Sequence, residues 1–197
     1  INNNTGVFQV SVRRQNDCMV SGGYILVGDS AWMPKPIDAG GIGPALIAGT
    51  ILGKNVVDAI EANDVTEKGL WQYHLDFIKE YGYKTAGLEL FRRLVQTLTN
   101  EQISYGMKHF LGNVDVEAIS KGEHPDFSGL SKLGMIIRGA MNKTVANGLK
   151  YTSQQNQWLV EHYGNYPKEP EGFEEWEKSL HKTLDESFAK IATFSKN

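Results

Sequence analysis

The residues whose types and spacing could do chemistry begin at a Gly-Asp pair near the N-terminal end of the chain. The apolar run "YILVG" ends at Gly28, and Asp29 follows at once. This composition predicts a short, fully buried strand, so the carboxylate would project just beyond its carboxyl end, where open α/β sheets bind their ligands. A carboxylate there accepts hydrogen bonds from hydroxyl groups and suits a polyol such as a ribityl or ribose chain.

A glycine-rich helix start lies shortly downstream of this acid. After Pro36, the segment "IDAGGIGPAL" places Gly40, Gly41 and Gly43 around Ile42. Free N–H groups at a helix N-terminus carry about half a positive charge, and glycines let a flat ligand approach the backbone. A ligand that carries a polyol, and whose ring becomes negatively charged on reduction, is a flavin. Asp after Gly alone is commonly a turn residue, so the prediction rests on the whole pattern.

At these residues the sequence resembles the second flavin motif of the p-hydroxybenzoate hydroxylase-like FAD enzymes. Within that group it looks most like archaeal geranylgeranyl reductases, which hydrogenate the isoprenoid chains of membrane lipids. The resemblance rests on "LVGDSAWMPKPIDAGGIGPALIAG", on Arg13 and Arg14 ahead of it, and on the helix "GLWQYHLDFIKEYG" after it. It covers about the first 85 residues well.

The resemblance implies FAD as the cofactor and hydride transfer from the flavin to a carbon-carbon double bond. Asp29 would bond the ribityl hydroxyls, Pro36 would lie near the flavin ring, and the backbone at Gly41 to Gly43 would face the pyrimidine edge of the ring. The source of the proton is not identified, and no residue is assigned a catalytic role. The expected cofactor-binding residues are Gly28, Asp29, Pro36, Gly40, Gly41, Ile42 and Gly43.

Two departures from the family pattern lead to further expectations. Asp38 stands close to the expected flavin, where an acid would oppose the reduced anion, so we expect it to turn away and cap the helix. The glycine fingerprint that binds the ADP half of FAD is missing, since Leu46 occupies its third glycine position in "GGIGPALIAG". We therefore expect the chain to be the C-terminal portion of a longer flavoenzyme, with the N-terminal half of the same protein as its partner.

Apolar periodicity predicts the elements that must position these residues. Alternation in "GVFQVSV" predicts a strand. Helical spacing begins at Gly40, with an apolar stripe of Ile42, Leu46, Leu52, Val56 and Ile60. Thr66 is a candidate N-cap, and Thr99 with Gln102 has the spacing of a capping box. Further helices are expected over 66–82, 88–98, 99–110, 130–141, 154–164 and 173–191.

The expected fold class is α/β at the N-terminal end, as the end of an FAD-binding domain, followed by a mainly α-helical C-terminal domain. Residues 1–20 would end a substrate domain and connect onward, and residues 21–63 would complete the FAD-binding domain. Residues 64–197 would form the helical domain. The stripe of Trp71, Tyr73, Phe77 and Tyr81 would be core or line a tunnel for an apolar substrate.

Composition excludes several classes. A net charge of −3 provides no basic surplus, so nucleic acid is not expected as a partner. Cys18 is the only cysteine and lies in a polar stretch without a histidine at a telling spacing, which favours an inert thiol and a cytoplasmic location. The segment "INNNTGVFQV" lacks the basic and apolar regions of a signal peptide, so we do not expect it to act as one, and no apolar run is long enough to span a membrane. The histidines include no pair with helical spacing, so no metal site is expected.

Three functions remain open from the sequence. The first is the reduction of geranylgeranyl chains in archaeal-type lipid biosynthesis, with an isoprenoid lipid substrate and peripheral contact with a membrane. The second is an FAD-dependent aromatic monooxygenase, because the same flavin motif serves both. The third is a helical docking module without its own activity, whose signature would be an exposed apolar stripe on residues 171–193.

Overall fold

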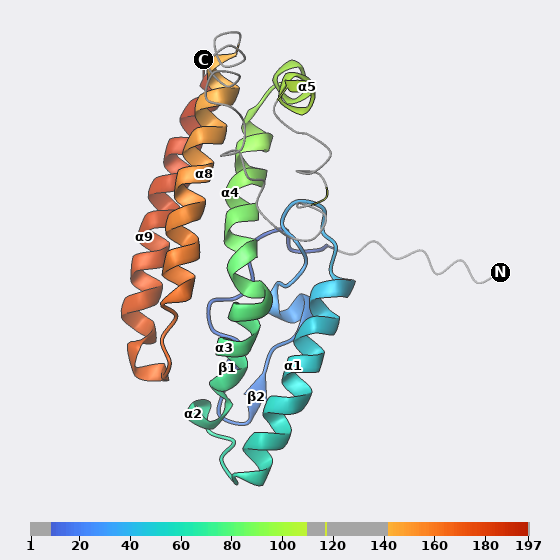
Figure 1. Ribbon diagram of the computed structural model, residues 1–197, viewed down its shortest axis with the longest axis vertical. Coiled ribbons are helices and arrows are strands. Elements are labelled where there is room, and N and C mark those ends of the chain that lie inside the picture. The colour runs from blue at the N-terminus through green and yellow to red at the C-terminus, as the bar shows by residue number, and fades with distance from the viewer. Residues whose placement is uncertain (1–8, 110–116, 118–141, 197) are drawn as a thin grey trace, which may run out of the picture.

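The computed structural model describes residues 9–109, 117 and 142–196, and within these ranges the protein is mainly helical (Figure 1). The α-helices are α1 (Ile42–Glu61), α2 (Glu67–Leu70), α3 (Gln72–Phe77), α4 (Tyr83–Thr97), α5 (Asn100–His109), α8 (Lys143–Gly164) and α9 (Phe173–Ala192). Three 3-10 turns are η1 (Gly28–Ala31), η3 (Pro170–Gly172) and η4 (Thr193–Lys196), and η2 (Ile78–Gly82) is a π-helical turn.

The N-terminal sheet is much smaller than the sequence predicts. Strands β1 (Val20–Ser21) and β2 (Tyr24–Ile25) form an antiparallel hairpin. The expected buried strand "YILVG" is therefore wrong, because only its first two residues pair and Tyr24 is 57% exposed. No third strand pairs with the hairpin among the described residues, so the buried position expected within a larger sheet does not arise there. Residues 9–12 are not a strand either, and residues 6–8 lie outside the described ranges.

Helix α1 forms as predicted, but only part of its predicted apolar stripe is covered, since Leu52 packs against the core and Val56 is half-buried while the other three residues face outward. Ile42 is 81% exposed, and Leu46 and Ile60 are also exposed. The buried side instead carries small or polar residues such as Ala48 and Asn55, which let α1 pack against α3. An apolar helix face thus remains uncovered by the described residues.

The helices predicted over 66–82 and 88–98 are not separated in the structure, because the π-helical turn η2 joins α3 to α4. The N-cap at Thr66 is confirmed, since its Oγ1 accepts a hydrogen bond from the Gly69 N–H at 3.3 Å. At η2 the wider turn leaves the Gly82 carbonyl available to other donors. It accepts from Gln15 Nε2 at 3.1 Å and from the Thr85 hydroxyl at 3.1 Å. The sequence predicted a break there, and the structure has a bulge that binds the N-terminal segment.

Three long helices form the C-terminal part. Figure 1 shows α8 and α9 along one side of α4 and α1 on the other. A Cβ on Gly148 would lie 2.5 Å from Leu94 Cδ1, so this glycine allows α8 to approach α4 closely. The capping box is confirmed, because Thr99 and Gln102 exchange hydrogen bonds of 2.9 and 3.3 Å. The predicted helix over 130–141 and the end of the one reaching Phe110 lie outside the described residues.

The apolar stripe of α9 is buried against the rest of the bundle. Trp176, Leu180, Leu184 and Ile191 are all buried, as the spacing predicts for a core helix. The exposed stripe that a docking module would need on residues 171–193 is therefore absent from the described part of this segment. Among the described residues, no helix combines the length and apolarity needed to cross a bilayer.

Candidate functional site

The Gly-Asp pair forms the tight turn η1 rather than the end of a strand. Gly28 has φ +68°, and the Trp32 N–H donates to the Asp29 carbonyl at 3.1 Å. Trp32 itself has φ +56°, an unusual value for a bulky residue and one found mainly at functional or tightly constrained positions. The Asp29 side chain is exposed, so it is free to meet a ligand.

Asp29 lies beside the N-terminus of α1. Gly41 is the N-cap of this helix, and no side chain caps it. A Cβ built on Gly41 would lie 3.4 Å from Asp29 Oδ1 and 3.3 Å from Pro34 Cγ. The structure therefore brings the carboxylate and the open N–H groups of the helix start together.

The loop before α1 is closed by an ion pair. Lys35 Nζ lies 2.8 Å from Asp38 Oδ2, and Asp38 Oδ1 accepts from the Gly40 N–H at 2.9 Å. Partial burial raises the pKa of Asp38, but the hydrogen bonds from Lys35 and Gly40 outweigh it, so the net pKa is lowered. The expectation that Asp38 caps the helix is wrong, because Lys35 holds it in the turn ahead of the N-cap.

A cavity of about 450 Å³ opens at this helix start. A Cβ on Gly43 would meet nothing within 4 Å, so the backbone there faces open space. Pro36 is buried, and neither it nor Asp29 lines the cavity. The lining consists of Lys35, Ala39, Gly40, Gly41, Ile42, Gly43, Pro44, Ile47 and Tyr81.

Tyr81 is the lining residue whose polar group has no partner. The side chain is 4% exposed, and its hydroxyl makes no hydrogen bond within the described part of the chain. Burial, with a smaller contribution from Asp38, raises the pKa of Tyr81, which keeps the hydroxyl protonated as a donor. Buried hydroxyls normally have partners, so an unpaired one is unusual. The sequence placed Tyr81 only in an aromatic stripe, all of which is buried.

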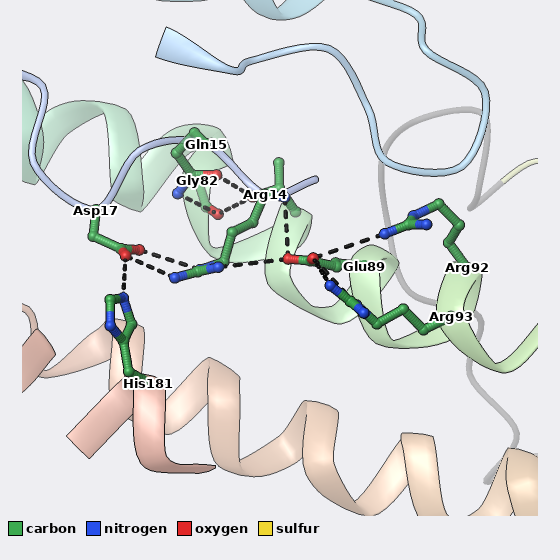
Figure 2. Close-up of polar contacts among 9 residues, drawn as sticks. Arg14, Gln15, Asp17, Gly82, Glu89, Arg92, Arg93 and His181 are labelled. Atoms are coloured by element: carbon green, nitrogen blue, oxygen red, sulfur yellow. Dashed lines mark hydrogen bonds and ion pairs between the residues drawn. The ribbon is translucent and has the colours of Figure 1, made fainter. Parts of the chain in front are cut away.

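A buried ionic network anchors the segment ahead of η1. Figure 2 shows Arg14 between two carboxylates. Its Nε and Nη2 bond Asp17 at 3.2 and 2.7 Å, and its Nη1 lies 3.6 Å from Glu89 Oε2. Glu89 is 2% exposed and also receives Arg93 Nη2 at 3.3 Å. The Asn16 N–H donates to the Ala31 carbonyl at 3.0 Å, which connects this network to the Gly-Asp turn.

Sequence reasoning missed this network because it treated residues 13–23 as a polar connection. The signal available was only the Arg13-Arg14 pair followed by Asp17. The partner Glu89 is 75 residues from Arg14, so no local pattern could have linked them.

Cys18 does have a histidine neighbour in space. His74 is fully buried, its Nε2 accepts from the Met19 N–H at 3.1 Å, and Cys18 Sγ lies 3.6 Å away. Burial lowers the pKa of His74 to about 3 and raises the pKa of the Cys18 thiol. A neutral imidazole and a protonated thiol form no reactive ion pair, which agrees with the prediction of an inert cysteine.

One group of potential metal ligands comes together from distant segments. One ligand atom each from Asp17, Glu177 and His181 lies within 4.8 Å of the others. The search for histidine pairs in the sequence could not find it. Both Asp17 oxygens already bond Arg14, and Oδ2 also lies 2.8 Å from His181 Nε2. The cluster is therefore explained by the ion pairs within the protein.

These features place the Asp29 carboxylate beside an uncapped helix N-terminus at which a cavity opens. No family model matches the chain. It is 33% identical over 179 residues to the digeranylgeranylglycerophospholipid reductase of Sulfolobus acidocaldarius, an alignment that covers 90% of this chain and 39% of that protein. It is also 28% identical over 101 residues to digeranylgeranylglycerophospholipid reductase 2 of Methanopyrus kandleri, covering 51% of this chain and 25% of that protein.

The chain is thus homologous to digeranylgeranylglycerophospholipid reductases, and it spans well under half the length of these relatives. A third relative, from Methanocella arvoryzae, carries the same name and is 29% identical over 100 residues, covering 51% of this chain and 25% of that protein. The resemblance inferred from the flavin-motif residues is confirmed at the level of this family.

Proposed function

We propose that this chain is the C-terminal portion of an FAD-dependent reductase that saturates the carbon-carbon double bonds of geranylgeranyl chains in archaeal-type phospholipids. The observation that carries the proposal is the placement of Asp29 beside the uncapped N-terminus of α1, in a chain related to enzymes of that name. The helix start supplies N–H donors and the carboxylate accepts hydroxyl groups, which together match the two ends of a riboflavin unit.

The residues present fit a flavin. A volume of about 450 Å³ lies within the usual range of small-molecule sites, roughly 300–1,000 Å³. The open backbone at Gly43 allows a flat ring to approach, and the Tyr81 hydroxyl offers a hydrogen bond. Asp29 would hold the ribityl hydroxyls. Because Pro36 is buried, we propose that it supports the loop under the ring from within the protein.

When bound, FAD would supply the hydride that adds to the isoprenoid double bond. The chain itself would orient the ring and stabilise its reduced form. The N–H groups of Ile42 and Gly43 point from a helix end that favours negative charge. Asp38 is paired with Lys35, so its charge is largely compensated and does not oppose a reduced anion.

The partner of this chain would be the N-terminal half of the same protein. Two observations support this: the uncovered apolar face of α1, with Ile42, Leu46 and Ile60, and the greater length of the relatives. We keep the division into residues 1–20, 21–63 and 64–197 as part of the proposal. Residues 1–197 alone should then bind FAD weakly, because the ADP half of FAD has no fingerprint here.

A phospholipid substrate also determines where the enzyme must work. We propose a cytoplasmic protein that contacts the membrane surface peripherally, since its substrate lies in a bilayer. Retention on vesicles that contain the substrate lipid, without detergent, would support this placement.

The test is anaerobic turnover of the complete protein with reduced FAD and digeranylgeranylglycerophospholipid. Loss of the double bonds in the lipid is the expected result. If the reduced enzyme instead leaves the lipid intact and hydroxylates an aromatic compound when oxygen is admitted, the monooxygenase alternative is correct.

A further inference from the structure

Four arginines surround a cleft on the side of α4 that faces α9. The cleft has a volume of about 520 Å³ and lies between residues 9–14, α4 and α9. We call it the arginine cleft, after Arg13, Arg14, Arg92 and Arg93, which all line it. It lies outside the flavin cavity, with which it shares no lining residue.

The chain supplies few negative charges to these arginines. Figure 2 shows Glu89 between Arg14 on one side and Arg92 and Arg93 on the other. Its carboxylate lies 3.6, 3.8 and 3.3 Å from the three guanidinium groups. Among these arginines, Asp17 forms an ion pair only with Arg14, and its Oδ2 also lies 2.8 Å from His181 Nε2. A single buried carboxylate is therefore shared by three cations.

Arg13 has no carboxylate partner in the described part of the chain. Its guanidinium carbon lies 4.1 Å from the centre of the Trp32 ring, and its buried Nε donates to nothing. The buried Nε of Arg92 is also without an acceptor. Burial lowers the pKa of both arginines, and the neighbouring Arg14 lowers that of Arg13 further. An anion in the cleft would reduce the repulsion that Arg14 exerts on Arg13 and that Arg93 exerts on Arg92.

The rest of the lining is partly apolar. Val10 and Val12 are 40% and 37% exposed, and Phe188 lies under the Arg93 guanidinium at 3.7 Å. Asp185 is the remaining acid, on the exposed edge of the cleft. Cations beside exposed valines match a ligand with an anionic head and an apolar arm.

We infer that the arginine cleft binds the phosphate group of a phosphate ester, with Arg13 and Arg92 donating to it and the apolar arm lying against Val10 and Val12. Guanidinium groups suit phosphate because their forked N–H donors match its oxygens. That the ester is the head of the isoprenoid phospholipid rests on the proposed function, whereas the anion site itself does not. A free phosphate ester and a lipid share this chemistry, and affinity for compounds with and without the apolar arm separates them.

The binding test uses the complete protein and the double variant Arg13→Gln/Arg92→Gln. This variant leaves Arg14 and Arg93 to hold Glu89. Binding of inorganic phosphate, glycerol phosphate and a short-chain dialkylglycerol phosphate is measured by calorimetry at constant ionic strength. We expect roughly tenfold or greater weakening for each probe in the variant. A control variant, Lys150→Gln/Lys182→Gln, removes two exposed charges outside the cleft and should bind like the wild type.

The outcomes separate a binding site from a structural cluster. Because the variant also loses the Arg92 contacts with Glu89 at 3.8 Å and with Gln96 at 2.6 Å, binding is compared at a temperature at which melting curves show both proteins folded. Absence of phosphate-specific binding in the wild type, or equal binding in wild type and variant, would overturn the inference. Equal affinity for glycerol phosphate and the dialkyl ester would overturn the assignment of Val10 and Val12 to an apolar arm.

A second measurement, the turnover of lipids with and without phosphate, tests this inference separately from the proposed function. Turnover of the isoprenoid phospholipid is compared with turnover of the same lipid lacking phosphate. The Arg13→Gln/Arg92→Gln variant should raise KM for the phospholipid toward that for the neutral lipid. If lipid reduction occurs but this preference survives in the variant, the headgroup assignment is wrong and the function stands. If no lipid is reduced but phosphate binding is lost in the variant, the proposed function is wrong and the anion site stands.

Discussion

The substitution Gly43→Ala should stabilise the protein while it weakens FAD binding. Gly43 lies in the first turn of α1, and an added Cβ would meet nothing within 4 Å. An unstrained Gly→Ala change in a helix contributes about 0.4–1 kcal/mol to the free energy of unfolding, mainly because the unfolded chain loses freedom. Gly41 is a poorer probe, because a Cβ there would already contact Asp29 and Pro34.

The effect on the ligand has the opposite sign. The new methyl group would occupy the space in which the flavin ring approaches the backbone, so the ring would move away from the helix end. The interaction of a charge with a helix N-terminus amounts to about 0.3–2 kcal/mol. Losing it raises the dissociation constant for the reduced, anionic flavin roughly two- to thirtyfold, and the steric displacement weakens binding of the neutral oxidised ring as well. The same displacement should lower the reduction potential of the bound flavin.

The assay combines an FAD titration, followed by quenching of flavin fluorescence, with melting curves of the flavin-free protein. Gly164→Ala is the matched control, since this residue ends α8, lies outside the cavity and has nothing within 4 Å of its ideal Cβ. Unchanged FAD affinity together with a raised melting temperature in Gly43→Ala would refute the flavin assignment. A lowered melting temperature with unchanged affinity would mean that protein, not ligand, covers Gly43.

The other predictions concern single side chains. Asp29→Ala should weaken FAD retention roughly tenfold or more, because charge-assisted hydrogen bonds contribute about 1.5–3 kcal/mol each, and equal retention in calorimetry would remove Asp29 from the site. Tyr81→Phe should not lower the melting temperature of the flavin-free protein but should weaken FAD binding, and the reverse pattern would make the hydroxyl structural. Glu89→Gln should lower the free energy of unfolding in urea by about 3–5 kcal/mol, because buried arginines lose their carboxylate; a change under about 1 kcal/mol would contradict this. The pKa of His74 is about 3 in the folded protein and about 6.5 in the unfolded chain. The neutral imidazole therefore contributes its full stabilisation above pH 6.5, and the free energy of unfolding falls by about 1.4 kcal/mol per pH unit as the pH drops from there toward 3. The variant His74→Gln should lack this part of the acid sensitivity of urea unfolding, and an unchanged profile would refute the assignment.

The helices were the most predictable part of the fold, because local periodicity determines them. The α9 stripe and the caps at Thr66 and Thr99 follow from spacing within a few residues, and the structure confirms them. The strands were not predictable in the same way. A run such as "YILVG" is compatible with a buried strand only if neighbouring strands exist, and the described residues supply only one short partner.

The face that α1 buries shows a second limit of prediction from the sequence. Its apolar residues Ile42 and Leu46 predicted the helix but not which face would be buried in this chain, because small residues on the other face allow closer packing against α3. Apolar spacing indicates that a face will be covered, without indicating by what.

The candidate site was predictable where its residues are adjacent in the chain. The Gly-Asp pair and the glycines of α1 could be named from the sequence, although their role in binding stays a prediction. Tyr81 and Glu89 could not be named, since contacts over tens of residues bring them to the cavity and to the arginines.

The most direct test of the central claim is amide hydrogen exchange at the start of α1, with and without FAD, in the complete protein. The first N–H groups of a helix have no partner within it, so those of Ile42 and Gly43 should exchange fast in the flavin-free protein. If the flavin ring lies on this helix end, FAD should slow their exchange while the exposed amides of η3 are unaffected. Equal exchange at Ile42 and Gly43 with saturating FAD would contradict the account.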